Sequence, residues 1–202
     1  MVVGAETAAD TADIETMTAD ELRAEVARLR EKLIRAEWTV AELEERADVD
    51  PMLDVLNRRG FERELTRSLA FVKRYGTPAV LMYIDLDGFK VINDRHGHAA
   101  GDALLKAVVA DLVRNLRASD VVGRLGGDEF GAVLWNVQPP QAAAKAASLE
   151  LTVERVAVDH NGTVLGCGAS VGIVAFDPAA SPAAMIEAAD RAMYERKRAR
   201  RS

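Results

Sequence analysis

Paired cysteines are missing from this sequence of 202 residues. Cys167 is the only cysteine, so no intramolecular disulfide can form, and a reducing cytoplasm is expected. Long apolar runs are missing too, since the longest, such as Ala79 to Ile84, are far short of the roughly 20 residues that a membrane span requires. The start of the chain lacks the basic and apolar regions of a signal peptide. These absences predict a soluble protein without a membrane segment.

An excess of basic residues is also missing. The formal net charge is −6, which argues against a general nucleic-acid binder, because such proteins are usually basic. The charge is unevenly spread: residues 1–50 hold 14 acidic and 6 basic side chains, whereas residues 51–202 hold 18 acidic and 20 basic ones. No nucleic-acid partner is therefore expected, but the slightly basic larger part can face an anionic ligand.

The N-terminal quarter predicts a tail followed by a long helix. Residues 1–17 are rich in Ala, Thr and acidic residues and predict a disordered tail. Thr18 and Glu21 have the spacing of a capping box, in which each side chain accepts a hydrogen bond from the other residue's amide. Apolar residues then recur at alternating intervals of four and three, namely Leu22, Val26, Leu29, Leu33, Ala36, Val40, Leu43 and Ala47. This heptad pattern within residues 18–49 predicts a coiled coil that joins two copies of the chain, and an amphipathic helix packed on its own domain is the alternative.

Residues 50–202 predict an α+β domain. Asp50 precedes a proline and ends the long helix, because that position disfavours helical backbone. Helical patterns cover residues 58–75, 89–95, 101–117, 141–155 and 182–200. Strand patterns cover residues 79–84, 121–125, 130–134 and 169–175, and Asn161-Gly162 marks a further hairpin. Helices that alternate with a mixed, mainly antiparallel sheet indicate an α+β sandwich.

Two carboxylates mark a candidate metal site. Asp85 ends the most apolar strand, where a carboxylate is costly unless something pairs with it. Asp128 lies at the tip of a hairpin, beside glycines that let a ligand approach the backbone. If the two strands are neighbours, both carboxylates point at one spot, and their oxygens suit Mg²⁺. Either residue alone would more simply be a turn cap, so the pair by itself does not establish a metal site.

Six short runs place these carboxylates in a larger pattern. The runs are Asn57-Arg58-Arg59, Asp85-Leu86-Asp87-Gly88-Phe89-Lys90, Asn93-Asp94, Gly97-His98, Gly101-Asp102 and Gly126-Gly127-Asp128-Glu129-Phe130. In this order, over about Asp50 to Ser202, they resemble the GGDEF domain of diguanylate cyclases. The resemblance implies a nucleotide-cyclase-like (palm or ferredoxin-like) fold, with helices flanking a central antiparallel sheet. It also implies a homodimeric enzyme of the bacterial cytoplasm that condenses two GTP molecules into cyclic di-GMP and two pyrophosphates.

The resemblance implies a two-metal centre. Asp85, the backbone carbonyl of Leu86 and Asp128 would hold two Mg²⁺ (or Mn²⁺) ions per active site, which activate a 3′-hydroxyl and shield the α-phosphate. Glu129 is a further candidate ligand or base. Lys90 would stabilise the charge that develops on the phosphates, and outside this motif it would be a solvated helix lysine.

Contacts to GTP are also implied by the resemblance. Asn93 and Asp102 would read guanine, because an ionised Asp only accepts hydrogen bonds and adenine presents an acceptor in one of those places. His98 lies near this pocket in the family, although packing of the turn explains it equally well. The remaining implied contacts are Phe89, Gly126, Gly127, Lys197 and Arg201.

The C-terminal phosphate contacts depart from the family pattern. Lys197 and Arg201, four residues apart on one helix face, correspond to the family's phosphate-gripping pair. Arg200 and Ser202, however, replace the usual Gly and Asn, so the last helix can continue and direct Arg201 elsewhere. A basic helix end is also favourable for the helix dipole, which is the alternative explanation of Arg201.

Arg117 and Asp120 fit the family's Arg-x-x-Asp inhibitory site, where the product cyclic di-GMP binds. Residues 121–125 separate Asp120 from Gly126, which is the spacing that the family requires. The alternative is a helix-terminal Arg followed by a turn Asp.

The joint before the domain also departs from the family pattern. Leu53 and Asp54 replace the usual Thr and Gly, which puts regulation in doubt more than activity. Residues 1–49 are too short for a sensor domain, so the chain either depends on an unseen regulatory protein or is constitutively active. Two other functions compete with cyclic di-GMP synthesis: a catalytically silent domain that binds cyclic di-GMP, and a cyclase of ATP. The intact signature motif opposes the first, and Asn93 and Asp102 oppose the second.

Overall fold

The structure is a computed structural model that describes residues 18–46 and 48–201, with residues 39–46 and 201 described by backbone only. The tail predicted for residues 1–17 lies outside the described residues. The chain divides into two compact units, Met1–Ala47 and Asp48–Ser202, which are considered separately below. Within the described ranges, no helix combines the length and the apolar character that crossing a membrane would require.

The first unit contains the long helix α2 (Ala19–Arg46). Its start has the predicted capping box: the Thr18 amide donates to Glu21 Oε2 over 2.8 Å, and the Glu21 amide donates to Thr18 Oγ1 over 3.3 Å. The first four apolar positions of the heptad pattern are 37–59% exposed, namely Leu22, Val26, Leu29 and Leu33. The side chains of Val40, Leu43 and Ala47 lie outside the described part. The coiled coil stays a prediction.

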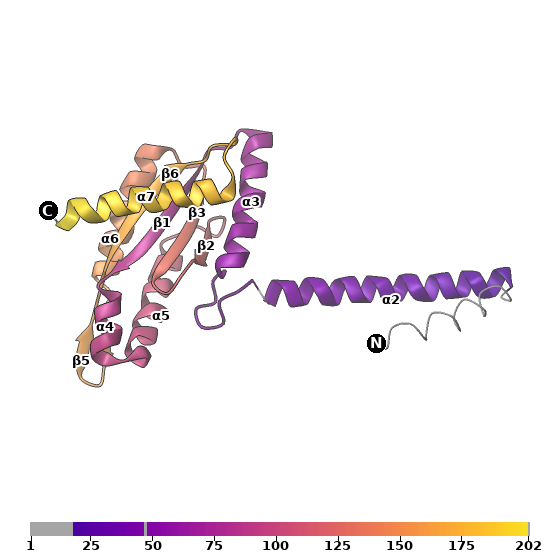
Figure 1. Cartoon of the computed structure of the whole chain (residues 1–202), viewed down its shortest axis with the longest axis horizontal. Helices are drawn as coiled ribbons and strands as arrows, with labels where there is room; N and C mark the ends of the chain where they lie inside the picture. Colours follow the sequence, from indigo (N-terminus) through magenta and orange to yellow (C-terminus); the bar gives the residue numbers. More distant parts are fainter. Residues whose placement is uncertain (1–17, 47, 202) are drawn as a thin grey trace, which may run out of the picture. The chain divides into compact units, whose positions relative to one another are not determined.

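The second unit has the predicted α+β architecture (Figure 1). Four antiparallel strands form the main sheet in the order β2-β3-β1-β6. Their bounds are Val121–Arg124 for β2, Glu129–Trp135 for β3, Ala79–Asp87 for β1 and Gly168–Ala175 for β6. The hairpin of β4 (Val158–His160) and β5 (Thr163–Leu165) turns at Asn161-Gly162, as predicted.

Five helices cover the sheet. They are α3 (Arg58–Tyr75), α4 (Phe89–His96), α5 (His98–Arg114), α6 (Pro139–Glu154) and α7 (Pro182–Arg201). Alternate residues of β1 face opposite ways. Met82 and Ile84 pack with α5 and α6, whereas Leu81 and Tyr83 pack with α3 and α7. Asp85 follows the second set, so it lies on the sheet face that α7 covers.

Two predicted elements of the second unit have bounds that differ from the structure by three residues. The strand predicted for residues 79–84 extends to Asp87, because antiparallel pairing with β6 continues as far as Asp87 opposite Gly168. The helix predicted for residues 101–117 is α5, which begins and ends three residues earlier. Gly97, with a φ of 83°, makes the sharp turn that lets α5 start directly after α4.

Gly172 sets how closely α7 lies over β6. A Cβ at this position would overlap the backbone carbonyl of Ala189 and the backbone nitrogen of Met193. Gly172→Ala is therefore expected to lower the free energy of unfolding by about 3 kcal/mol, since a helix backbone cannot give way as a side-chain tip can. Urea unfolding measures this, with Gly127→Ala as the control because a Cβ there meets nothing within 4 Å. Equal stability of the two variants would contradict the packing described here.

Candidate functional site

The hairpin between β2 and β3 brings Asp128 to the end of β1. Asp85 of β1 pairs with Glu129 of β3, and the Leu86 amide donates to the Asp128 backbone carbonyl over 3.1 Å. Burial, followed by the negative charge of Asp85, raises the pKa of the Asp128 carboxyl. The Asp85 and Asp128 carboxylates, which were predicted to point at one spot, therefore lie close enough to repel one another.

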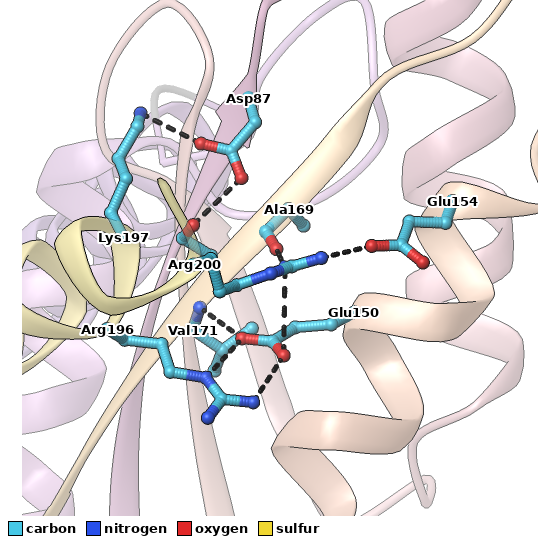
Figure 2. A network of polar contacts seen from close by, with 9 residues as sticks. Asp87, Glu150, Glu154, Ala169, Val171, Arg196, Lys197 and Arg200 are labelled. Carbon is cyan, nitrogen blue, oxygen red and sulfur yellow. Dashed lines mark hydrogen bonds and ion pairs between the residues drawn. The ribbon is translucent and has the colours of Figure 1, made fainter. Parts of the chain in front are cut away.

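Lys197 of α7 brings a positive charge to the same place. Its ammonium forms an ion pair with Asp85 and a second one with Asp87 Oδ1 over 3.1 Å, and Figure 2 shows the second. Burial opposes the charged form of Lys197, but hydrogen bonds to Asp85 and Asp87 outweigh it, and the pKa of Lys197 is raised. Ser170 Oγ also donates to Asp87 Oδ2 over 2.8 Å. Lys197 is therefore charged at neutral pH and held against the carboxylates of β1.

The donor atoms at this end of the sheet fit a hard divalent cation. The Asp85 and Asp128 carboxylates and the Leu86 carbonyl are all oxygen donors, which Mg²⁺ and Mn²⁺ prefer. Within the described ranges, no three His, Cys, Asp or Glu side chains gather into a preformed metal cluster. The chain can thus supply part of a coordination shell, and substrate phosphates and water would complete it.

Glu129 faces a tyrosine that the sequence did not single out. The Leu125 amide donates to the Glu129 carbonyl over 2.8 Å, which closes the hairpin. Burial, and next the charge of Glu129, raise the pKa of Tyr83, which also forms a hydrogen bond with Glu129. A Cβ on Gly126 would collide with the Glu129 carboxylate, whereas Gly127 faces open space. Gly126 therefore leaves room for the glutamate, and Gly127 leaves room for a ligand.

The two predicted guanine readers come from adjacent helices. Asn93 is a half-buried residue of α4, and Asp102 is an exposed residue of α5. A Cβ on Gly101 would overlap Asn93 Oδ1, so this glycine is what allows Asn93 to lie against the start of α5 beside Asp102. His98 is exposed at the first position of α5.

Lys90 and Phe89 begin α4 but differ in exposure. Lys90 is exposed, as a phosphate contact requires. The Phe89 ring is only 5% exposed and belongs to the hydrophobic core, so a GTP contact from this residue stays a prediction for its backbone alone. A buried aromatic ring cannot reach a ligand without disrupting the core.

Arg117 and Asp120 line one cavity of about 230 Å³. Asp120 is also a turn residue, as the alternative explanation held: its Oδ2 accepts from the Arg117 amide over 2.9 Å, and its Oδ1 accepts from the Trp135 amide over 3.2 Å. Arg117 itself is exposed. Four further polar residues line the cavity and were not predicted from the sequence, namely Asn115, Asn136, Gln141 and Lys145.

The last helix continues where the family usually has a glycine. α7 runs through Arg200 to Arg201, and the Arg200 guanidinium binds the Ala169 carbonyl and the Glu154 carboxylate (Figure 2). The substitution at position 200 therefore has a structural consequence, because a glycine could make neither contact. The side chain of Arg201 lies outside the described part.

Arg124 was missed by the sequence analysis and supports the hairpin. Its guanidinium donates to the Gly126 carbonyl over 2.9 Å and to the Gly127 carbonyl over 2.8 Å. It also pairs with Asp50 Oδ2 over 3.0 Å, in the turn that precedes α3. The pair with Asp50 follows no local sequence pattern, since Asp50 and Arg124 are 74 residues apart.

Asp50 organises the joint where the sequence departs from the family. Its Oδ1 accepts from the amides of Met52 (2.9 Å) and Leu53 (3.1 Å). Leu53 is buried in the core, which explains an apolar residue where the family has Thr. Asp54 has a φ of 54°, a left-handed conformation that suits the family's usual Gly and that Asp tolerates.

Asp50 is expected to stabilise the second unit in a pH-dependent way. Burial opposes its charged form, but hydrogen bonds from Arg124, Met52 and Leu53 outweigh it, and the pKa of Asp50 is lowered. Stability from such a carboxylate is present above the unfolded-state pKa of about 4 and is lost as the pH falls through the lower folded-state value. Asp50→Asn is expected to cost about 2 kcal/mol at pH 7, with the gap to wild type closing below about pH 4.

Denaturant unfolding between pH 3 and pH 7 measures this gap. Glu62→Gln, which breaks an exposed pair with Arg58, is the control and is expected to change stability little at any pH. A cost of Asp50→Asn that stays constant down to pH 3 would contradict the role given to the charge.

Comparisons with known proteins agree with this geometry. Residues 47–202 match the family model described as diguanylate cyclase, GGDEF domain. Diguanylate cyclase TpbB of Pseudomonas aeruginosa is 34% identical over 181 residues, which are 89% of this chain and 40% of TpbB. The coiled coil and GGDEF domain of DgcB from Caulobacter crescentus, solved with cyclic di-GMP, superpose with a TM-score of 0.74 at 25% identity, covering 88% of this chain and 95% of that one.

A third similar structure is diguanylate cyclase SiaD of P. aeruginosa in complex with its activator SiaC. It has a TM-score of 0.72 at 26% identity and covers 96% of this chain and 80% of that one. The chain spans less than half the length of the curated relatives it matches, such as TpbB. Because the family model covers three quarters of the sequence and the sheet places the motif residues together, the chain belongs to the GGDEF family of diguanylate cyclases.

Proposed function

We propose that this protein is a diguanylate cyclase that condenses two GTP molecules into one cyclic di-GMP and two pyrophosphates. The observation that carries the proposal is the convergence of Asp85, Asp128 and Lys197 at the end of β1. Phosphoryl transfer depends mostly on positioning and electrostatics, and this cluster offers both signs of charge around one spot. The similarity to TpbB, which is a diguanylate cyclase, supports the same chemistry.

The proposed metal centre uses Asp85, the Leu86 carbonyl and Asp128, with Glu129 as a further ligand or base. Two Mg²⁺ or Mn²⁺ ions bound there would polarise the α-phosphate and lower the pKa of the attacking 3′-hydroxyl. The Lys197 ammonium offsets part of the negative charge of Asp85 and Asp87, and it would contact the phosphates when GTP is bound. Lys90 would bind the phosphates from the start of α4, with Gly127 leaving space for the nucleotide and Gly126 leaving space for Glu129 beside it.

Selectivity for GTP is assigned to Asn93 and Asp102. The Asp102 carboxylate can accept two hydrogen bonds from the guanine edge, whereas adenine would place an acceptor against it. His98 lies at the first position of the same helix and would border the base. Substitution of GTP by ATP should therefore leave the carboxylate unsatisfied and prevent turnover.

The product requires two nucleotides, so two domains must meet. Each domain offers one GTP site, and the exposed apolar positions of α2 provide a means of joining two copies. DgcB was solved with its coiled coil, and SiaD was solved with an activator protein. We therefore include a coiled-coil homodimer and a separate regulatory protein in the proposal.

Incubation with GTP and Mg²⁺, followed by chromatography, tests the proposed function. Cyclic di-GMP is expected from GTP, and no cyclic product is expected from ATP. A protein that binds cyclic di-GMP but leaves GTP unchanged would instead be a silent effector domain.

Product inhibition through Arg117 and Asp120 is a further part of the proposal. The cavity they line holds four more polar side chains, which suit the guanine edges and phosphates of cyclic di-GMP. A ligand there inhibits only if it favours a nonproductive arrangement over the catalytic one. Arg117→Ala is expected to keep the initial rate within about twofold but to weaken inhibition at least tenfold, because a charged hydrogen-bonding group is lost.

Progress curves with and without added cyclic di-GMP measure this effect. Arg155→Ala, at the end of α6 and outside the cavity lining, is the matched control and should leave inhibition unchanged. If wild-type protein neither binds cyclic di-GMP nor slows in its presence, Arg117 and Asp120 serve only as a helix end and a turn.

A further inference from the structure

We propose that Glu150, a buried carboxylate of α6, is a positioning residue for the reaction: it fixes the final turns of α7 and thereby the place of Lys197 (Figure 2). The inference rests on the proposed function, in which the Lys197 ammonium contacts the phosphates of GTP. Glu150 itself does not touch the carboxylates of the site and would act through α7.

Glu150 joins three elements. It is only 4% exposed, and a buried carboxylate is costly unless it is fully paired. Its Oε1 accepts from the Val171 amide of β6 over 3.1 Å and from Arg196 Nε over 3.2 Å, and its Oε2 accepts from Arg196 Nη2 over 2.8 Å. Two parallel bonds between a guanidinium and a carboxylate fix both direction and distance. The residue next to Arg196 is Lys197.

Arg200 adds a second attachment one turn further along α7. It lies 3.7 Å from Glu150 and binds Glu154, also on α6. It also donates to the Ala169 carbonyl of β6. The end of α7 is therefore held at two successive turns against α6 and against the edge strand of the sheet.

The same stretch of β6 also contacts Asp85 and Asp87 of β1. Ser170 lies between Ala169, whose carbonyl binds Arg200, and Val171, whose amide binds Glu150. It pairs with Asp85 in the sheet, and its hydroxyl donates to Asp87. Glu150 thus holds α7 against the strand that also orients Asp87. If this attachment were lost, the last turns of α7 would shift and Lys197 would move relative to both carboxylates, because a flexible lysine side chain does not fix its own position.

A buried ion pair can also stabilise a fold without any role in a reaction, so the test must separate the two. Glu150→Gln keeps the shape and an acceptor for the Val171 amide but removes the charge that Arg196 and Arg200 bind. Affinity for 3′-deoxy-GTP, which lacks the attacking hydroxyl, is measured by calorimetry with Mg²⁺ in the full chain. The substitution is made both in wild type and in Lys197→Met.

Glu150→Gln is expected to weaken binding of 3′-deoxy-GTP about tenfold in the wild-type background and to raise KM for GTP by a similar factor. In the Lys197→Met background it is expected to cause no further loss, because residues that act through one group are not additive. Glu150→Asp, which keeps the charge, should retain part of the affinity. Glu187→Gln breaks an exposed pair with Arg191 on the same helix and should change nothing.

Three outcomes would overturn the inference. They are unchanged affinity in Glu150→Gln, an equal loss in both backgrounds, and wild-type affinity in Lys197→Met. If Glu150→Gln fails to fold, Arg196→Gln and Arg200→Gln remove the partners of Glu150 instead. Their affinity for 3′-deoxy-GTP is then compared in the same two backgrounds. A wild-type protein that binds no GTP and makes no product would instead refute the proposed function, and the inference with it.

Discussion

Asp128→Asn is expected to lower cyclic di-GMP synthesis at least about 1,000-fold, because a metal ion's stabilisation of the transition state is worth several kcal/mol. The substitution keeps the size of the side chain and removes the charge that a divalent cation would bind. Asp159→Asn, in the remote β4–β5 hairpin, is the matched control and should keep wild-type turnover. Initial rates of product formation with saturating GTP and Mg²⁺ measure the effect.

The fold of the Asp128→Asn variant is expected to be intact. Burial and Asp85 raise the pKa of Asp128, so its charged form is disfavoured in the folded protein, and removing the charge should not lower stability at pH 7. Thermal unfolding is the check. A folded variant with near-normal turnover would show that Asp128 is no metal ligand.

Loss of the exposed apolar side chains on α2 is expected to lower the specific activity strongly at low protein concentration. With Leu29 and Leu33 replaced by Lys, two domains can meet only by diffusion, whereas a coiled coil holds the second domain at an effective concentration near millimolar. Specific activity at nanomolar protein should fall at least about 100-fold and should recover steeply as the protein concentration rises. Deletion of residues 1–47, the first compact unit, should lower the specific activity in the same concentration-dependent way.

Ile34→Lys provides the matched control for assembly. Ile34 is 52% exposed on the same helix but lies outside the heptad positions, so a Lys there replaces an exposed apolar residue by a charge without loss of a predicted dimer contact. Sedimentation across the same concentration range reports the oligomeric state. Full specific activity from a dilute monomer would contradict the need for two domains.

Local signals in the sequence account for most of the fold. The helix predicted for residues 58–75 has those bounds in α3, because Asn57 caps its first turn and Gly76, with a φ of 66°, ends it. The antiparallel sheet could also be expected, since short strands and hairpin turns follow one another closely. Both signals depend on neighbours in the chain, which is why they can be read without a structure.

Contacts between distant residues could not be predicted in this way. Nothing near Glu150 indicates that it pairs with Arg196, which is 46 residues away, or that Asp50 pairs with Arg124. The partnership of Tyr83 with Glu129 likewise needs the register of β1 against β3. The motif residues could be predicted because their order along the chain resembles a known family, whereas the residues that support them depend on this chain's own packing.

The stoichiometry of the reaction tests the central proposal most directly. Purified full-length chain is incubated with GTP and Mg²⁺, and GTP, pyrophosphate and cyclic di-GMP are quantified over time. One pyrophosphate for each GTP consumed, and one cyclic di-GMP for every two, is the predicted result. Consumption of GTP without a cyclic product, or binding of cyclic di-GMP without any consumption of GTP, would contradict it.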